Sequence, residues 1–339
     1  MKIDIHTHIM PAKMPNWAKR FGYGEFVHLE HRNCKACMMK GDQLFREVEE
    51  NCYHATSRLR DMEETGVDRQ VLSTIPVLFN YWARPGDGLE TARFLNDHIA
   101  ETVQETPGKF IGLGTVPLQD TQLAIGEMER CLHDLHLRGI EIGTNVNGKN
   151  LGAPDLFPFF EAAERLGCAL FIHPWEMMGE QQMQRYWLPW LVGMPAETTR
   201  AICSLIFGGV LERFPRLRIA FAHGGGSFPY TIGRIEHGFD VRPDLVQIDN
   251  TINPRHYLGK FWVDSLVHDA KAFALLRETV TDSRVCVGSD YPFPLGEQRP
   301  GALIESLELS RETKEKFLYR NALDWLGITN TEQEHDEIV

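Results

Sequence analysis

Short apolar runs recur along the chain, and between them apolar residues return every three or four positions. The runs predict buried strands, and the periodic stretches predict amphipathic helices. Strands are expected at residues 3–8, 67–75, 110–118, 139–143, 169–174, 218–223, 261–266 and 285–290. Helices are expected at residues 55–66, 89–105, 121–137, 156–166, 197–213, 230–239, 270–279 and 311–326.

This alternation of strands and helices predicts parallel strands joined by right-handed crossovers. Eight such units, in a sequence without a glycine-rich nucleotide fingerprint, favour a closed barrel over an open sheet. We therefore predict an α/β fold, a (β/α)8 TIM-type barrel. It should form a single domain over residues 1–327, with a polar tail at residues 328–339.

Residues 11–51 interrupt the alternation with a mixture of Gly, Pro, aromatic and charged residues. They predict an irregular flap inserted after the first strand. Within the flap, metal-type side chains fall at steps of three, at His28, His31, Cys34 and Cys37. Zinc fingers instead place two close pairs far apart, with a loop between them. A flap with incidental thiols is therefore preferred over a zinc knuckle.

Composition limits the possible partners and compartments. Hydrophobic residues make up 43% of the 339, which is enough for a large core, and no apolar run is long enough to span a membrane. The net charge of −12 argues against nucleic acid or an anionic membrane as a partner. The seven cysteines are scattered and odd in number, and a strand at residue 3 leaves no room for a signal peptide. Both features predict reduced thiols and a cytoplasmic location.

Histidines and an aspartate occupy the ends of four predicted strands. His6 and His8 lie two apart on the first strand, so their side chains share a face. Alone, the pair could be two surface histidines at a terminus. His173, His223 and Asp290, however, each follow an apolar run. Because the carboxyl ends of barrel strands meet at one face, this register predicts a metal site there.

These five positions resemble the active-site residues of the mononuclear amidohydrolase superfamily. Longer stretches, at residues 173–177, 186–198 and 288–297, resemble its decarboxylases for 2-amino-3-carboxymuconate 6-semialdehyde. The likeness runs from residue 1 to about residue 327. It implies a role in tryptophan or 2-nitrobenzoate catabolism.

The resemblance also implies roles for individual residues. One Zn²⁺ per chain would be held by His6, His8, His173 and Asp290. His223 would be the catalytic base. Arg46 and Arg234 would bind carboxylates of a small anionic substrate, the second from the partner subunit of a homodimer. Residues near the pocket would be Trp190, Phe293 and Met177.

The implied reaction is zinc-dependent, non-oxidative decarboxylation of the semialdehyde to 2-aminomuconate 6-semialdehyde and CO₂. Two alternatives remain open. The same site could hydrolyse a small carboxylated ester, lactone or amide, or the chain could be a non-catalytic metal-binding scaffold that has no use for His223. Without the resemblance, Arg46 and Arg234 would be read as ordinary surface charges.

Overall fold

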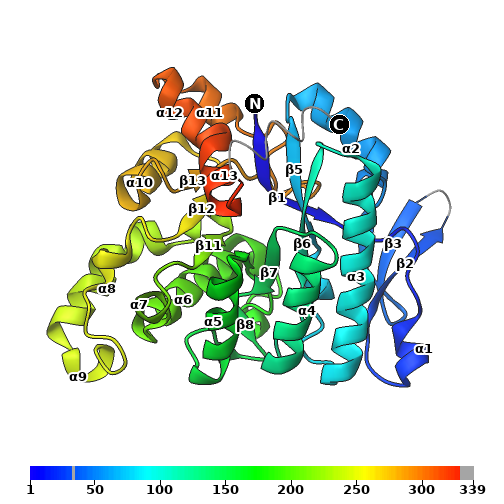
Figure 1. Ribbon diagram of the computed structural model, residues 1–339, viewed down its shortest axis with the longest axis horizontal. Helices are drawn as coiled ribbons and strands as arrows, with labels where there is room; N and C mark the ends of the chain where they lie inside the picture. Colours follow the sequence, from blue (N-terminus) through cyan, green and yellow to red (C-terminus); the bar gives the residue numbers. More distant parts are fainter. Residues whose placement is uncertain (33–34, 329–339) are drawn as a thin grey trace.

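The computed structural model describes residues 1–32 and 35–328 and confirms the predicted barrel (Figure 1). Its parallel strands, in spatial order, are β1 (Ile3–Ile9), β5 (Arg69–Thr74), β6 (Phe110–Thr115), β7 (Gly139–Gly143), β10 (Ala169–His173), β11 (Arg218–Phe221), β12 (Trp262–Asp264) and β13 (Val285–Cys286). The chain that follows β13 closes the ring against β1. The Ile5 N–H donates to the Val287 carbonyl at 2.9 Å, and the His8 N–H donates to the Tyr291 carbonyl at 2.8 Å.

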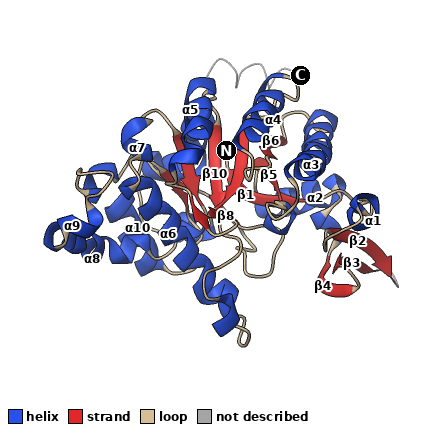
Figure 2. Cartoon of the chain, turned by 90° about the horizontal axis from the view of Figure 1, so that it is seen from below, coloured by secondary structure: helices blue, strands red, loops and turns tan. Residues whose placement is uncertain are grey.

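Helices surround the strands, which lie at the centre of the molecule (Figure 2). They are α2 (Ala55–Thr65), α3 (Pro85–Glu105), α4 (Thr121–His133), α5 (Phe157–Leu166), α6 (Met194–Phe207), α7 (Val210–Arg213), α8 (Phe228–Val241), α9 (Pro243–Val246), α10 (Ala270–Val280), α11 (Ala302–Ser306), α12 (Arg311–Glu315) and α13 (Asn321–Leu326). The helix predicted at 197–213 is two helices, because Gly209 turns the chain with φ +72°. The helix predicted at 311–326 contains a π-helical turn at Lys316–Arg320.

Strand β1 carries a bulge that decides where its side chains point. Its register with β5 shifts between Asp4 and Thr7. Ile3 lies before the shift and Ile5 within it, and both pack in the interior of the barrel with residues such as Phe171. His6, which also lies within the shift, faces the interior as well, because a bulge re-aims the side chains at its position. Simple alternation would have sent the histidines to the opposite face from the isoleucines.

The flap is more regular than the sequence suggested. It contains α1 (Trp17–Phe21) and an antiparallel sheet of β2 (Val27–Arg32), β3 (Lys35–Lys40) and β4 (Gln43–Val48), beside the barrel in Figure 2. The apolar side of this sheet packs on Ile75 and Val77 after β5. The prediction of an irregular segment was therefore wrong. In β2, more buried and less buried residues alternate, as is typical of a strand with one covered face.

The knuckle alternative finds no support in the described part of the flap. His28 and His31 lie three apart on β2, so their side chains point to opposite faces of the sheet. His28 Nε2 contacts Glu30 Oε1 at 3.0 Å, and His31 Nε2 contacts the Ala12 carbonyl at 3.2 Å. Cys34 lies outside the described residues.

Beneath the barrel, α13 covers the amino-terminal ends of the strands. Trp325 packs there against Phe171, and Ile328 joins the same cluster. Residues 329–339, the remainder of the predicted tail, lie outside the described residues. Two short strands, β8 (Asn145–Val146) and β9 (Lys149–Asn150), form a hairpin after β7. Among the helices that the structure describes, none is both long and apolar enough to cross a membrane.

Candidate active site and metal centre

Four of the predicted strand-end residues converge on one point in the mouth of the barrel. Each of His6, His8, His173 and Asp290 is buried and offers one ligand atom, and these atoms all lie within 4.8 Å of one another. His6 Nε2 and His8 Nε2 are 3.2 Å apart, and His8 Nε2 is 3.1 Å from Asp290 Oδ1. Elsewhere in residues 1–32 and 35–328 no comparable cluster of metal-type side chains occurs.

The outer hydrogen bonds of His8 and His173 point the lone pairs of their other ring nitrogens toward the centre of the cluster. His8 Nδ1 lies 2.9 Å from the Thr74 carbonyl, and His173 Nδ1 lies 2.9 Å from the Pro174 carbonyl. A carbonyl can only accept, so both Nδ1 atoms carry the hydrogen and both Nε2 atoms carry a lone pair. The buried Nε2 of His173 has no partner among the described residues. Together with a ring nitrogen of His6 and a carboxylate oxygen of Asp290, these nitrogens are a donor set for a divalent cation, and the site is a metal-binding site.

Burial and charge keep these groups in their ligating forms. Burial lowers the pKa of His8 and, together with the neighbouring histidines, holds the pKa of His173 well below its usual value. Although burial alone would raise it, the pKa of Asp290 lies well below its usual range because of hydrogen bonds with His223 and His8 and the charge of His6. At neutral pH His8 and His173 therefore present neutral imidazoles, and Asp290 presents an ionised carboxylate.

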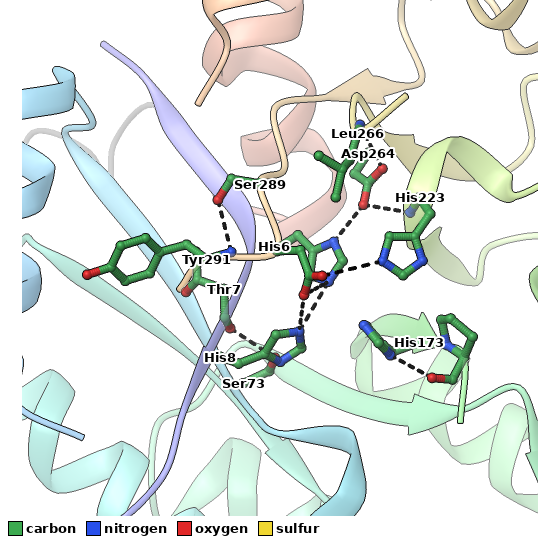
Figure 3. Close-up of polar contacts among 12 residues, drawn as sticks. His6, Thr7, His8, Ser73, His173, His223, Asp264, Leu266, Ser289 and Tyr291 are labelled. Atoms are coloured by element: carbon green, nitrogen blue, oxygen red, sulfur yellow. Dashed lines mark hydrogen bonds and ion pairs between the residues drawn. The ribbon is translucent and has the colours of Figure 1, made fainter. Parts of the chain in front are cut away.

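His223 lies beside the four ligands without joining them. Its Nε2 is 3.9 Å from Asp290 Oδ2, and its ring lies close to those of His6 and His173 (Figure 3). Its other ring nitrogen, Nδ1, is buried without a hydrogen-bond partner among the described residues. Both His223 and Asp290 have positive φ angles, of 56° and 57°. Such strain in non-glycine residues concentrates at functional sites.

A cavity opens above the ligands. One chamber, of about 40 Å³, is lined by His8, His173 and Asp290 and walled by rings that include Trp190 and Phe293. An adjoining chamber, of about 310 Å³, lies beyond Trp190 and is lined by His223 and His268. Mostly apolar walls around a few converging polar groups are typical of a small-molecule site.

Arg46 faces this cavity from the flap. It lies on β4, and its guanidinium carbon is 4.7 Å from the centre of the Phe293 ring and 5.8 Å from that of Trp190. Burial lowers the pKa of Arg46, against the opposing charge of Asp290. None of the ion pairs formed by the described residues involves Arg46. A half-buried cation without a carboxylate partner suits an anionic substrate.

The remaining predicted pocket residues divide into two groups. Trp190 and Phe293 line the cavity. Met177 does not: it is buried below the turn at Pro189–Gly193, where Gly193 leaves room for it. Arg234 is exposed on α8, outside the set of residues that line the cavity of its own chain. The structure describes a single chain, so contribution of Arg234 to a partner's pocket stays a prediction.

Two buried carboxyl groups next to the ligands were missed in the sequence. Asp264 on β12 is within 2.7 Å of His6 Nδ1, and Glu141 on β7 is 3.7 Å from His8 Nδ1. Burial raises the pKa of Glu141 well above its usual value, whereas hydrogen bonding to His6 offsets burial and lowers that of Asp264. The available signal was an acidic residue inside each of the apolar runs 139–143 and 261–266.

Comparison with known proteins agrees with this geometry. The model of the family described as Amidohydrolase matches residues 3–328. A 2-amino-3-carboxymuconate-6-semialdehyde decarboxylase from Dictyostelium discoideum is 58% identical over 97% of this chain and 92% of its own. The protein of the same name from Caenorhabditis elegans is 38% identical over 96% of this chain and 94% of its own.

Among solved structures, a 5-carboxyvanillate decarboxylase from Novosphingobium aromaticivorans, in complex with manganese, has the same fold. It superposes with a TM-score of 0.80 over 96% of both chains, at 22% sequence identity. The decarboxylase relatives at 58% and 38% identity, together with the barrel and the metal centre, define a carboxy-lyase built on the amidohydrolase fold. The chain belongs to the amidohydrolase superfamily and, within it, to the family of 2-amino-3-carboxymuconate-6-semialdehyde decarboxylases.

Proposed function

We propose that the protein catalyses the zinc-dependent, non-oxidative decarboxylation of 2-amino-3-carboxymuconate 6-semialdehyde to 2-aminomuconate 6-semialdehyde and CO₂. The observation that carries this proposal is the position of Arg46. Its guanidinium faces the same cavity as the metal-binding residues, without a carboxylate of its own among the described residues. A substrate with carboxylates would supply that partner. The names of the two relatives, at 58% and 38% identity, support this choice of substrate.

Zinc is the proposed metal, with one ion per chain. Three neutral imidazole nitrogens and one carboxylate oxygen match the preferences of Zn²⁺ and leave room for water at the site. The manganese in the similar decarboxylase makes Mn²⁺ the main competitor. When bound, a cation of this kind supplies a water whose pKa is lowered to about 7.

The chemical obstacle lies in the substrate. Loss of CO₂ from a vinylic carbon would leave an electron pair in an sp² orbital, out of conjugation. Addition of water across the double bond makes that carbon tetrahedral and removes the obstacle. CO₂ and hydroxide then leave, the electron pair of the broken C–C bond re-forms the double bond, and a proton from solvent restores the water.

His223 is placed to move the proton in the addition step. It lines the cavity with its Nε2 3.9 Å from Asp290 Oδ2, and its Nδ1 has no hydrogen-bond partner among the described residues. We expect it to take a proton from the attacking water and to return it to the carbon that carries the leaving carboxylate. Arg46 would hold a carboxylate through two parallel hydrogen bonds and so orient the bond that breaks. Trp190 and Phe293 would keep solvent away from that bond.

A homodimer would complete the site with Arg234 of the second chain. Arg234 makes no hydrogen bond or ion pair with another described residue, and it lies on an exposed helix. Large apolar side chains are exposed near it, on α8 and α9 and just beyond, at Tyr230, Val241, Leu245 and Ile248. An apolar surface of this kind around an unpaired arginine suits a two-fold interface.

The proposed reaction is tested by the mass of the product. Incubation of the zinc-loaded protein with the semialdehyde should release one CO₂ per substrate and lower the mass of the organic product by that of CO₂. A product heavier by one water, without gas, would indicate hydrolysis and contradict the proposal. Metal-stripped protein is the matched control and should leave the substrate unchanged.

A further inference from the structure

Asp264 occupies a central position between the metal centre and His223. It ends β12, its side chain is fully buried, and it lies inside the barrel. The glycine at position 288 allows it to approach β1. A Cβ at Gly288 would lie 2.6 Å from Asp264 Cβ and 2.9 Å from His6 Cβ, far closer than packed atoms allow. The barrel is therefore shaped to bring this carboxylate against a metal ligand.

Four donors converge on the two oxygens of Asp264. Figure 3 labels His6, His223 and Leu266 among the residues around this carboxylate. Oδ2 accepts from His6 Nδ1 at 2.7 Å and from the backbone N–H of His223 at 2.8 Å. Oδ1 accepts from the backbone N–H of Gly224 at 2.7 Å and of Leu266 at 3.0 Å. An ionised carboxylate is acceptor-only, so every one of these contacts requires a hydrogen on the partner. The hydrogen of neutral His6 therefore sits on Nδ1, and its Nε2 lone pair faces the metal centre.

Asp264 also holds the turn that carries His223. His223 and Gly224 both adopt left-handed conformations, with φ angles of 56° and 60°. This conformation is strained for His223, because its side chain, unlike that of glycine, has a Cβ. Asp264 accepts hydrogen bonds from the two consecutive backbone N–H groups of this turn. Among the described residues, no other side chain accepts a hydrogen bond from these two N–H groups.

The carboxylate distinguishes His6 from the other two histidine ligands. His8 and His173 are oriented by neutral backbone carbonyls, those of Thr74 and Pro174. Only His6 is oriented by a buried negative charge at hydrogen-bond distance. A carboxylate partner makes a ligating imidazole a stronger donor to its metal, and removal of such a partner weakens metal binding.

We propose that Asp264 is a positioning residue that sets the metal-binding tautomer of His6 and the orientation of His223 with the same carboxylate. The His223 part rests on the proposed role of that residue in proton transfer. The His6 part rests on the metal centre alone. Asp264 itself does not line the cavity, so it acts through these two neighbours.

The substitution Asp264→Asn tests the proposal with almost no change in volume. The amide of asparagine has one acceptor atom, its oxygen. Its NH₂ group must therefore face one of two pairs of donors: His6 Nδ1 with the His223 N–H, or the N–H groups of Gly224 and Leu266. If it faces His6, the hydrogen of the imidazole moves to Nε2 and blocks the metal. We expect the dissociation constant for Zn²⁺, measured by competition with a chromophoric chelator, to rise by about 10- to 100-fold.

A matched control is Glu127→Gln on α4. Glu127 is equally buried and accepts from Asn96 and Arg130, but it touches no metal ligand. Its variant should bind Zn²⁺ as the wild type does, even if it melts earlier. Unchanged Zn²⁺ affinity in Asp264→Asn, or an equal loss in both variants, would overturn the proposal.

Double variants separate positioning from general support of the fold. In a His6→Ala background, Asp264→Asn should cost less than about threefold in Zn²⁺ affinity, because the ring it orients is gone. At saturating Zn²⁺, Asp264→Asn should lower kcat, and this loss should vanish in a His223→Ala background. The same fold-loss in each background would mean that Asp264 acts on the fold at large, and would overturn the proposal. A wild-type protein without decarboxylase activity would contradict the proposed function, whereas the Zn²⁺ titration decides the present inference in either case.

If Asp264→Asn does not fold, the unmodified protein provides the measurement. In zinc-loaded protein labelled with ¹⁵N-histidine, the Nδ1 of His6 should carry a hydrogen that exchanges slowly with solvent. An unprotonated Nδ1 on His6 would contradict the proposed tautomer.

Discussion

Replacement of Arg46 by methionine should abolish most activity without weakening the fold. Arg46 is the only predicted substrate-binding arginine that faces the cavity of its own chain. Methionine is similar in length and can keep the contacts with the rings of Phe293 and Trp190, but it cannot bind a carboxylate. The variant therefore removes the charge and its hydrogen bonds and leaves the wall of the cavity in place.

The magnitude follows from the contacts that are lost. A hydrogen bond between charged groups contributes about 1.5–3 kcal/mol, and a guanidinium fork makes two of them with a carboxylate. The sum of about 3–6 kcal/mol corresponds to a fall in kcat/KM of roughly 10²- to 10⁴-fold. Stability should respond differently, because Arg46 has no carboxylate partner within the described residues to leave unpaired. The free energy of unfolding should change by no more than about 0.5 kcal/mol, and Tm by no more than about 1 °C.

The assay is steady-state kinetics on the semialdehyde, with a thermal melt of the same samples. Arg84→Met is the control, since Arg84 stacks on Tyr23 at 4.4 Å but lies away from the cavity. It should keep wild-type kcat/KM. The reasoning would be refuted by an Arg46→Met enzyme with unimpaired kcat/KM, or by one that loses activity only because its Tm falls by many degrees.

Three further predictions concern proton transfer, subunit sharing and pH. His223→Ala should keep its Zn²⁺ and lose activity by about 10²-fold or more, as shown by metal analysis beside kinetics; parallel loss of metal would make His223 a ligand. Arg234→Ala and His223→Ala, mixed after verified subunit exchange, should regain roughly a quarter of wild-type activity, because half of the dimers are mixed and each of these has one intact site. Continued inactivity would rule out sharing in trans. Burial alone would lower the pKa of His6, but the hydrogen bond to Asp264 and the charges of Asp290 and Asp264 raise it. The pKa values of His8 and His173 are instead lowered by burial. Acidification should therefore protonate His6 first and weaken Zn²⁺ binding by about tenfold per pH unit below that pKa, as measured by chelator competition; affinity independent of pH would contradict this.

The barrel and its metal ligands could be predicted because each depends on a local pattern. Strand β7 was placed at its observed bounds, Gly139–Gly143, from an apolar run alone. His173 and Asp290 were found because a polar residue directly follows such a run. Once eight strands close into a barrel, their carboxyl ends meet at one face, so the ligands converge without further information.

Other features depend on contacts between segments far apart in the chain. The bulge in β1, which brings His6 into the interior beside Ile5, appears only in its pairing with β5. The role of Asp264 depends on a partner 258 positions away, and an acidic residue in an apolar run does not reveal that partner. The three strands of the flap were missed because their mixed composition hid the alternation that packing on Val77 requires.

The most direct test of the account is a titration of metal-stripped protein with Zn²⁺ while CO₂ release from the semialdehyde is measured. If the cluster of His6, His8, His173 and Asp290 holds the single ion that decarboxylation needs, activity should rise from zero and break sharply at one Zn²⁺ per chain. Decarboxylation by fully stripped protein, or a break at any other ratio, would contradict the account.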